Sequence, residues 1–99
     1  NQVELLAKVV SRYCEIPVAN VLLRIKETHP QFDLPKAERI KNVIGAFKVS
    51  DGKLVYNKTL LLLDDIYTTG ATVAECSKVL KVAGARRVEV LTLARALEM

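Results

Sequence analysis

The sequence predicts an α/β domain in which helices flank a mostly parallel sheet, and three observations support this prediction. The apolar run Leu60–Leu63 is bounded by polar residues on both sides, as in a strand buried on both faces of a parallel sheet. A helical pattern follows this run, and a second run of valines and leucines, residues 88–93, follows the helix. Strands that alternate with helices of this length indicate βαβ crossovers.

The size and composition of the chain fit a single soluble domain. With 99 residues, 51% of them apolar, the chain can form one compact core. The longest apolar run is far shorter than the roughly 18 to 20 residues of a membrane span. Residues 1–12 also lack a secretory signal core, so we expect a cytoplasmic protein with no membrane contact. The net charge of +4 suits phosphate-rich small molecules and permits weak contact with nucleic acid.

Residues 1–25 predict a helix followed by a strand. Apolar residues at spacings of three and four form one stripe of the helix, namely Leu5, Leu6, Val9, Val10 and Tyr13. Pro17 follows the helix, and residues 18–25 are rich in valine and leucine, which is typical of a strand. Cys14 and Cys76 are isolated and fall at apolar helix positions, so we expect buried free thiols and no zinc site.

The middle of the chain, from residue 26 to about residue 42, has no regular pattern because prolines and charges of both signs interrupt it. A short helix over Lys36–Val43 is compatible with this stretch. So is a loop that closes over an active site, since long loops in compact domains are commonly functional. Residues 46–56 predict a β-hairpin with Asp51-Gly52 in a type I′ turn, because glycine accepts the positive φ that this turn requires.

The last third of the chain predicts a helix and a final strand. Gly84 stands where a left-handed C-terminal cap of this helix would be. With no internal repeat or linker, residues 1–99 form a single domain. A sheet of this class normally begins with a strand, and the sequence lacks a starting Met, so we expect the C-terminal part of a longer protein. A domain that begins with a helix is the alternative. The apolar face of the predicted helix consists of Val73, Cys76, Val79, Leu80 and Ala83.

Two kinds of polar group meet between the central strand and the following helix. Asp64 and Asp65 would lie beyond the carboxyl end of the strand, where open α/β sheets bind ligands. Their carboxylates only accept hydrogen bonds, so they suit sugar hydroxyls or a hydrated divalent cation. Residues 68–72 offer hydroxyls and the N–H groups of a helix N-terminus, which suit a phosphate. Gly70 lets the backbone approach closely, because it has no side chain and tolerates strained dihedral angles.

A ribose 5-phosphate, with adjacent hydroxyls at one end and a phosphate at the other, fits both halves of this stretch. Each residue taken singly also has a structural explanation. A threonine at a helix start is an ordinary N-cap, and an aspartate at a strand end is ordinarily solvated. A response-regulator receiver also has an acidic pair near a strand end, but a Thr-Thr-Gly turn would have no role there. The order of all thirteen residues, 60–72, favours the ligand site.

This stretch, Leu-Leu-Leu-Leu-Asp-Asp-Ile-Tyr-Thr-Thr-Gly-Ala-Thr, resembles the phosphoribosyl-pyrophosphate (PRPP) motif of type I phosphoribosyltransferases. Tyr67 is the one departure, because this position is usually aliphatic. Further motifs spread over essentially the whole chain make it similar to the competence-protein ComF family. These motifs are residues 1–7, Gln31 with Leu34, Arg39 with Asn42, Gly45-Ala46-Phe47, and residues 91–95.

The resemblance implies a Rossmann-like, phosphoribosyltransferase fold that lacks its first core strand and its pyrophosphate loop, which in the family precede position 1. It also implies site roles. Asp64 and Asp65 would hold the ribose 2′ and 3′ hydroxyls, directly or through Mg²⁺. The 5′-phosphate would be bound by Ile66, Tyr67, Thr68, Thr69, Gly70, Ala71 and Thr72.

Residues 26–45 would correspond to the family's flexible loop over the pyrophosphate, with Arg24, Gln31, Arg39 and Asn42 as the candidate contacts. Arg39 could meet phosphate or could equally be solvated or ion-paired. The activity implied is displacement of pyrophosphate from the ribose, which depends on positioning and charge stabilisation. No residue identifies a catalytic base or the acceptor.

Three functions therefore stay open. The first is a Mg²⁺-dependent phosphoribosyltransferase, and the second is a non-catalytic, competence-associated protein that binds PRPP or single-stranded DNA. The third is a folded but inert fragment of such a domain. With aromatic residues at only 5%, no stacking platform for DNA is evident in the sequence. A second copy of this chain, in a homodimer, is a further candidate partner.

Overall fold

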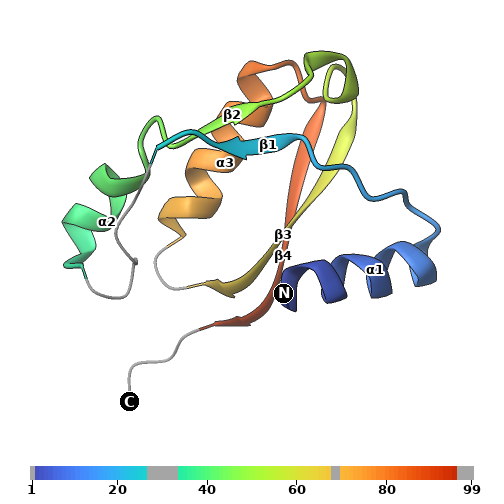
Figure 1. The fold of residues 1–99 in the computed structure, drawn as a ribbon, viewed down its shortest axis with the longest axis horizontal. Helices are drawn as coiled ribbons and strands as arrows, with labels where there is room; N and C mark the ends of the chain where they lie inside the picture. The colour runs from blue at the N-terminus through green and yellow to red at the C-terminus, as the bar shows by residue number, and fades with distance from the viewer. Residues whose placement is uncertain (1, 27–33, 68–69, 96–99) are drawn as a thin grey trace.

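The computed structural model describes residues 2–26, 34–67 and 70–95, and it confirms the α/β class. β3 and β4 are the longest strands and run side by side, with α3 on one side of them and α1 on the other (Figure 1). The elements in chain order are α1 (Gln2–Cys14), β1 (Leu22–Arg24), α2 (Lys36–Val43), β2 (Phe47–Val49), the 3-10 helix η2 (Gly52–Leu54), β3 (Thr59–Tyr67), α3 (Ala71–Val82) and β4 (Arg87–Arg95).

The described strands form two separate pairs. β3 and β4 are parallel, with Thr59 opposite Arg87 and Asp64 opposite Thr92, and α3 connects them. This arrangement confirms the predicted βαβ unit. β1 and β2 pair antiparallel to each other. Because the parallel sheet has two strands in the described residues, the prediction of one mostly parallel, Rossmann-like sheet is not confirmed.

The hairpin predicted over residues 46–56 is wrong. β2 ends at Val49 and pairs with β1, and the chain then turns into η2. The Asp51 carboxylate caps η2 by accepting a hydrogen bond from the Lys53 N–H at 3.0 Å. Gly52 is not among the positive-φ residues that a type I′ turn would require. The local bond from the aspartate side chain to the backbone therefore starts a 3-10 turn in place of the hairpin.

The two predictions for residues 18–43 have different outcomes. The short helix over Lys36–Val43 is confirmed as α2 with the same bounds. The strand over residues 18–25 is confirmed only at Leu22–Arg24, because its partner β2 offers three residues to pair with. Strand length here is set by a distant segment, not by the local valines and leucines.

α3 ends at the glycine cap that the sequence predicts. Gly84 has a φ of +103° and donates its N–H to the Lys81 carbonyl at 3.0 Å. The next N–H, that of Ala85, reaches back to the Leu80 carbonyl at 3.0 Å. These two bonds make a Schellman motif, and Ala85 packs against the buried cluster that contains Leu80. The cap fixes the direction in which the chain enters β4.

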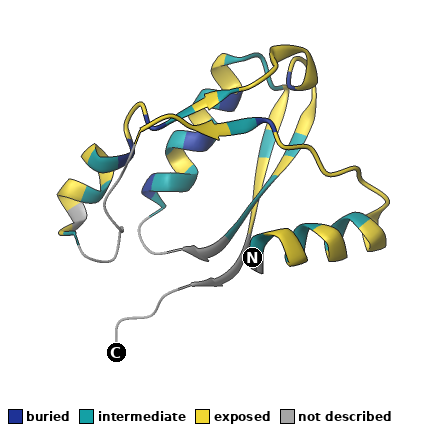
Figure 2. Ribbon diagram, viewed as in Figure 1, coloured by how far each residue is buried: buried dark blue, intermediate teal, exposed yellow. Residues whose placement is uncertain are grey.

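The core is small and lies near the start of β3. Val21, Val55 and Leu80 are buried together, with Leu80 only 2% exposed. Leu60 and Val88, one from each parallel strand, pack against this cluster. Figure 2 shows the buried residues along α3, at the ends of β1 and β2 and beside η2. The β1–β2 pair and α3 therefore cover one end of the parallel pair.

The four leucines of β3 are less buried than predicted. Leu60, Leu62 and Leu63 are half-buried, and Leu61 is 36% exposed. Burial on both faces needs neighbouring strands and two covering layers. The described sheet has two strands, so its edges and part of its surface stay open.

The apolar stripe of α1 is divided between two environments. α1 contacts β3, and its Leu6 and Val10 are half-buried. Leu5, Val9 and Tyr13 are exposed. In the described parts of the chain, no helix has the length and apolar character needed to cross a membrane.

Candidate ligand site at the turn between β3 and α3

β3 carries both aspartates of the motif within the strand. It runs to Tyr67, so Asp64 and Asp65 precede its end, whereas the sequence placed them beyond it. The strand continues this far because β4 pairs with it as far as Arg95. Asp64 lies opposite Thr92, and its side chain is half-buried. The side chain of Asp65 falls outside what the structure describes.

α3 begins with a left-handed glycine. Gly70 is the N-cap residue, with φ of 80° and ψ of 3°, which a residue with a β-carbon adopts only at a cost. Its carbonyl accepts a hydrogen bond from the Ala74 N–H at 2.7 Å, so the helix starts at Ala71. The conformational freedom predicted for Gly70 is thus confirmed. Thr68 and Thr69, the two predicted phosphate contacts before it, lie outside the described residues.

The first turn of α3 has the polarity that an anion requires. α3 is 12 residues long and has no acidic residue in this turn. The N–H groups of a first turn point toward the start of the helix, and the helix dipole adds partial positive charge there. Ala71 is buried and Thr72 is half-buried. This end of the molecule therefore combines a carboxylate on β3 with a helix N-terminus.

Charged groups surround Cys76, which lies in the second turn of α3. The thiol is buried, at 6% exposure. Burial, together with the negative charges of Asp64 and Glu75, raises the pKa of Cys76 to about 11, while Arg24 acts in the opposite direction. The thiol therefore stays protonated at neutral pH. The prediction of a buried thiol is confirmed for Cys76 and wrong for Cys14, which is exposed where α1 ends.

The β1–β2 pair holds Arg24 on the side of α3 that carries Cys76. Its guanidinium carbon lies 5.4 Å from the centre of the Phe47 ring, which belongs to the residue opposite it in register. Glu75 accepts a hydrogen bond from the Gly45 N–H at 3.3 Å, and this bond ties α3 to the segment before β2. Arg24 and Asp64 both act on Cys76, so the fold brings these two charges to one region. Sequence reasoning missed Glu75, because a single glutamate on a helix carries no pattern.

The other loop candidates lie elsewhere. Arg39 and Asn42 belong to α2 and are half-buried, and Gln31 lies outside the described residues. The Arg39 Nε donates to the Leu34 carbonyl at 2.8 Å, so this side chain holds α2 to the segment before it. α2 in turn contacts α3, beside which it lies in Figure 1. The stretch predicted as a flexible loop, residues 26–45, therefore contains a helix packed on α3.

The donor set at this turn fits one kind of magnesium site. Among the residues that the structure describes, no cluster of three or more His, Cys, Asp or Glu side chains could hold a metal ion. A site built from three or more of these side chains is therefore not present in that part. Mg²⁺ commonly uses only one or two carboxylates and takes its other ligands from water and substrate phosphates. Asp64 fits that second arrangement.

The relatives of the chain are competence and DNA-utilization proteins. "Competence protein F" of Haemophilus influenzae is 38% identical over 99 residues, which cover 97% of this chain and 43% of the relative. "Competence protein ComFC" of Streptococcus pneumoniae is 36% identical over 74 residues, which cover 75% of this chain and 33% of the relative. "DNA utilization protein YhgH" of Escherichia coli K12 is 33% identical over 99 residues, which cover 98% of this chain and 42% of the relative. The chain thus spans less than half the length of these relatives.

These similarities support the resemblance to the ComF family. Two of the three relatives carry the competence name, and two of the matches extend over nearly the whole chain. No protein-family model matches the chain, and no solved structure matches it. The phosphoribosyltransferase interpretation therefore depends on the residues of the turn themselves.

Proposed function

We propose that this chain binds PRPP, or another ribose 5-phosphate, at the turn between β3 and α3, as part of a phosphoribosyltransferase-like protein. The observation that carries the proposal is the combination of a half-buried Asp64 on β3 with the left-handed Gly70 that opens α3. Strand and helix thereby offer a hydrogen-bond acceptor and hydrogen-bond donors to one ligand. A sugar phosphate is the ligand class that needs both.

The 5′-phosphate would lie at the start of α3, where the N–H groups from Gly70 to Thr72 and the helix dipole favour a dianion. The ribose hydroxyls would donate to the Asp64 carboxylate, with Asp65 next to it in the strand. A bound Mg²⁺ would neutralise pyrophosphate charge. Ile66, Tyr67, Thr68 and Thr69 complete the motif between the aspartates and the helix.

Arg24 adds a cation on the β1–β2 side of the same region. Its guanidinium is held over Phe47, so less side-chain freedom is lost when it meets a phosphate oxygen than for an unsupported arginine. A planar guanidinium pairs well with phosphate, which suits the pyrophosphate end of PRPP. In a transferase these groups would act by positioning the ligand and by stabilising the charge of the departing pyrophosphate.

Thermal unfolding in the presence of PRPP and Mg²⁺ tests the proposal. A ligand that binds only the folded chain stabilises it by about 2.7 kcal/mol when its concentration is about 100 times its Kd. We expect a higher Tm with PRPP and Mg²⁺ than with Mg²⁺ alone, and a smaller rise for Asp64→Asn. An unchanged Tm at millimolar PRPP would remove the proposal. Release of pyrophosphate with candidate nucleobases or amines then separates turnover from binding.

A second candidate function is a non-catalytic role in handling DNA, as part of competence in the cytoplasm. It is supported by the names of the relatives, two of which are competence proteins and one a DNA utilization protein. This role predicts salt-dependent binding of single-stranded DNA that survives the double substitution Asp64→Asn with Asp65→Asn. Failure to bind such DNA at low salt would exclude it.

A further inference from the structure

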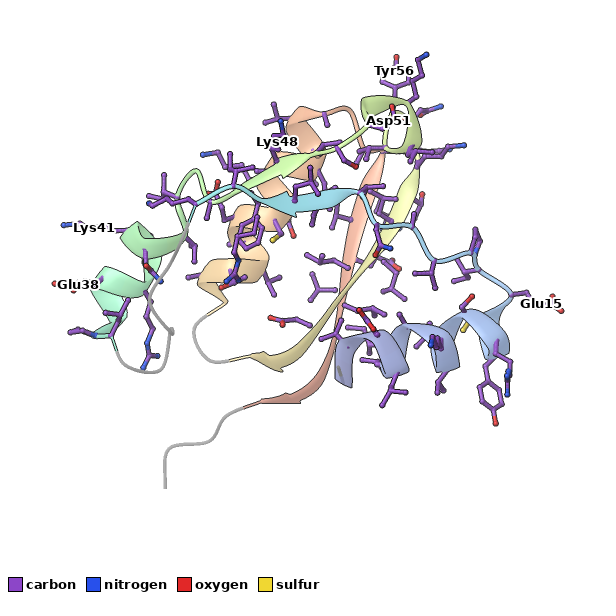
Figure 3. All side chains as sticks on the ribbon, in the orientation of Figure 1. Glu15, Glu38, Lys41, Lys48, Asp51 and Tyr56 are labelled. Atoms are coloured by element: carbon purple, nitrogen blue, oxygen red, sulfur yellow. The ribbon has the colours of Figure 1, made fainter. Side chains whose placement is uncertain are left out.

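A pocket with an exposed tyrosine lies at the opposite end of β3 from the motif. It has a volume of about 510 Å³ and is lined by Gly52, Lys53, Tyr56, Lys58 and Ala83. Figure 3 shows Tyr56 and Asp51 at this end of the molecule, beside η2. The nine residues of β3 separate it from the β3–α3 turn by roughly 25 to 30 Å, at about 3.3 Å per residue. We call it the Tyr56 pocket.

Tyr56 is exposed but held in place. Tyr56 is 70% exposed, yet its ring lies close to the backbone of Gly84. A β-carbon added at Gly84 would come within 2.7 Å of the Tyr56 Cδ2. The ring therefore rests on the glycine backbone. Backbone bonds hold Tyr56 and the residue after it: the Tyr56 N–H donates to the Gly52 carbonyl at 2.9 Å, and the Asn57 N–H donates to the Gly84 carbonyl at 2.8 Å. A fixed, exposed ring stacks with little loss of side-chain entropy.

Two lysines, Lys53 and Lys58, line the pocket together with this ring. Residues 51–58 and 81–89 meet here, because the Arg86 N–H donates to the Lys58 carbonyl at 2.8 Å. Each of their two carboxylates is already engaged: Asp51 accepts from a backbone N–H of η2, and Glu89 pairs with Arg87 at 2.9 Å. The two segments carry five cations, of which Arg87 is the partner of Glu89, namely Lys53, Lys58, Lys81, Arg86 and Arg87.

We propose that the Tyr56 pocket binds a nucleobase together with its phosphate, with the base on the Tyr56 ring and the phosphate between Lys53 and Lys58. An apolar ligand would leave two lysines without a role, and a simple anion would leave the ring without one. The pocket is shallow and open to solvent, so a ligand bound there would keep one side exposed, as a base stacked on a surface ring does. A free nucleotide and a single strand of nucleic acid both offer this chemistry. The pocket shares no residue with the proposed PRPP site, so each proposal can fail alone.

Calorimetric titration of the chain with adenosine 3′-monophosphate (AMP) and with a 12-nucleotide oligodeoxythymidylate at low salt tests this inference. This isomer of AMP has a base and a phosphate but lacks the 5′-phosphate that the proposed PRPP site would bind. Tyr56→Leu keeps an apolar side chain on Gly84 but removes the ring, and we expect it to weaken AMP binding about tenfold, as for the loss of one stacked base. Tyr56→Phe should bind like the wild type. The matched control is Tyr13→Leu, which removes another exposed tyrosine, on α1 between Arg12 and Cys14, and should change nothing.

The two probes distinguish the sources of the ligand. Tighter binding of the oligonucleotide than of AMP, with an affinity that falls as salt rises, assigns the pocket to single strands. One-to-one binding of AMP with no gain for the oligonucleotide assigns it to free nucleotides. In either case Lys53→Gln with Lys58→Gln should weaken binding and lower its salt dependence.

Three results would overturn the inference: no binding of either probe, equal AMP affinity for Tyr56→Leu and the wild type, or loss of AMP binding in Asp64→Asn. If Tyr56→Leu does not fold, the wild-type chain still provides the test. AMP should then shift the amide resonances of Gly84 and Asn57 in NMR spectra and leave those of Gly70 unchanged, and the reverse pattern would count against the pocket.

Discussion

The two ends of the parallel β3–β4 pair are built from different kinds of interaction. At the end where β3 begins, Val55 and Leu80 are buried together, and a Schellman motif at Gly84 fixes the path from α3 into β4. At the end where β3 leads to α3, the described groups are polar or strained: a half-buried Asp64 and a left-handed Gly70. Packing thus holds one end of the βαβ unit, and the proposed ligand site lies at the other.

This difference suggests how a small core would support the proposed site. The buried cluster anchors the start of β3 and the last turn of α3, and these two rigid elements carry Asp64 and Gly70 to the same end of the unit. Groups that bind a ligand commonly sacrifice some stability, and the scaffold compensates elsewhere. The predictions below test whether stability and binding are separated in this way.

The largest effect is expected at the packed end. Leu80→Ala should lower the free energy of unfolding by about 2 to 5 kcal/mol, because it leaves a cavity in the buried cluster. Leu61→Ala, on a residue that is 36% exposed, should cost less than about 1.5 kcal/mol. Urea unfolding followed by circular dichroism measures both. Similar losses for the two variants would mean that the core does not lie where the buried residues place it.

Gly70 and Gly84, two of the three described glycines with a positive φ, should respond differently to alanine. Gly84→Ala should lower the free energy of unfolding by about 1 to 3 kcal/mol. Its φ of +103° is unfavourable for alanine, and the new β-carbon would come within 2.7 Å of the Tyr56 ring. Gly70→Ala should cost about 1 to 2 kcal/mol from the φ of +80° alone. Only Gly70→Ala should also weaken PRPP binding. If Gly84→Ala weakened PRPP binding as much while remaining folded, the two ends would not be independent.

The Cys76 thiol provides a smaller, pH-dependent effect. Its pKa is raised from 9.0 to about 11, so between these values the unfolded chain ionises while the folded chain keeps its proton. Below pH 9 the protonated thiol makes its full contribution to the free energy of unfolding. As the pH rises toward 11 this contribution, about 1 to 3 kcal/mol, is lost. Cys76→Val should show a flatter decline over this range. An identical decline in both proteins would show that lysine and tyrosine titration accounts for all of it.

Local chemistry explains what the sequence could predict of the fold. β3, α3 and α2 follow from apolar runs and helical spacing, and the Gly84 cap follows from a conformation that glycine adopts readily. The antiparallel pairing of β1 with β2 joins segments that are far apart in the sequence, so no local pattern predicts it. The hairpin prediction was wrong because the Asp51 carboxylate accepts a hydrogen bond from the nearby Lys53 N–H. Burial of Leu60–Leu63 depended on the number of neighbouring strands, which local sequence does not contain.

The candidate site was predictable to a similar extent. Asp64 and Gly70 were identified from one contiguous motif, and the structure describes Asp64 within β3 and Gly70 as the left-handed residue that opens α3. The position of Arg24 over Phe47 and the bond from Gly45 to Glu75 are tertiary contacts, so the motif could not reveal them. The position of the Tyr56 ring could not be predicted either, because the ring lies against Gly84, which is 28 positions away.

The most direct test of PRPP binding is calorimetric titration of PRPP with Mg²⁺ into the wild-type chain, Asp64→Asn and Asp51→Asn. Asp51 is the matched control, because its carboxylate lies on η2 at the packed end. We expect saturable one-to-one binding by the wild type and by Asp51→Asn. Asp64→Asn should bind at least about tenfold more weakly, as for the loss of a charged hydrogen-bond acceptor. No binding by the wild type, or equal affinity for Asp64→Asn and the wild type, would contradict a PRPP site at the β3–α3 turn.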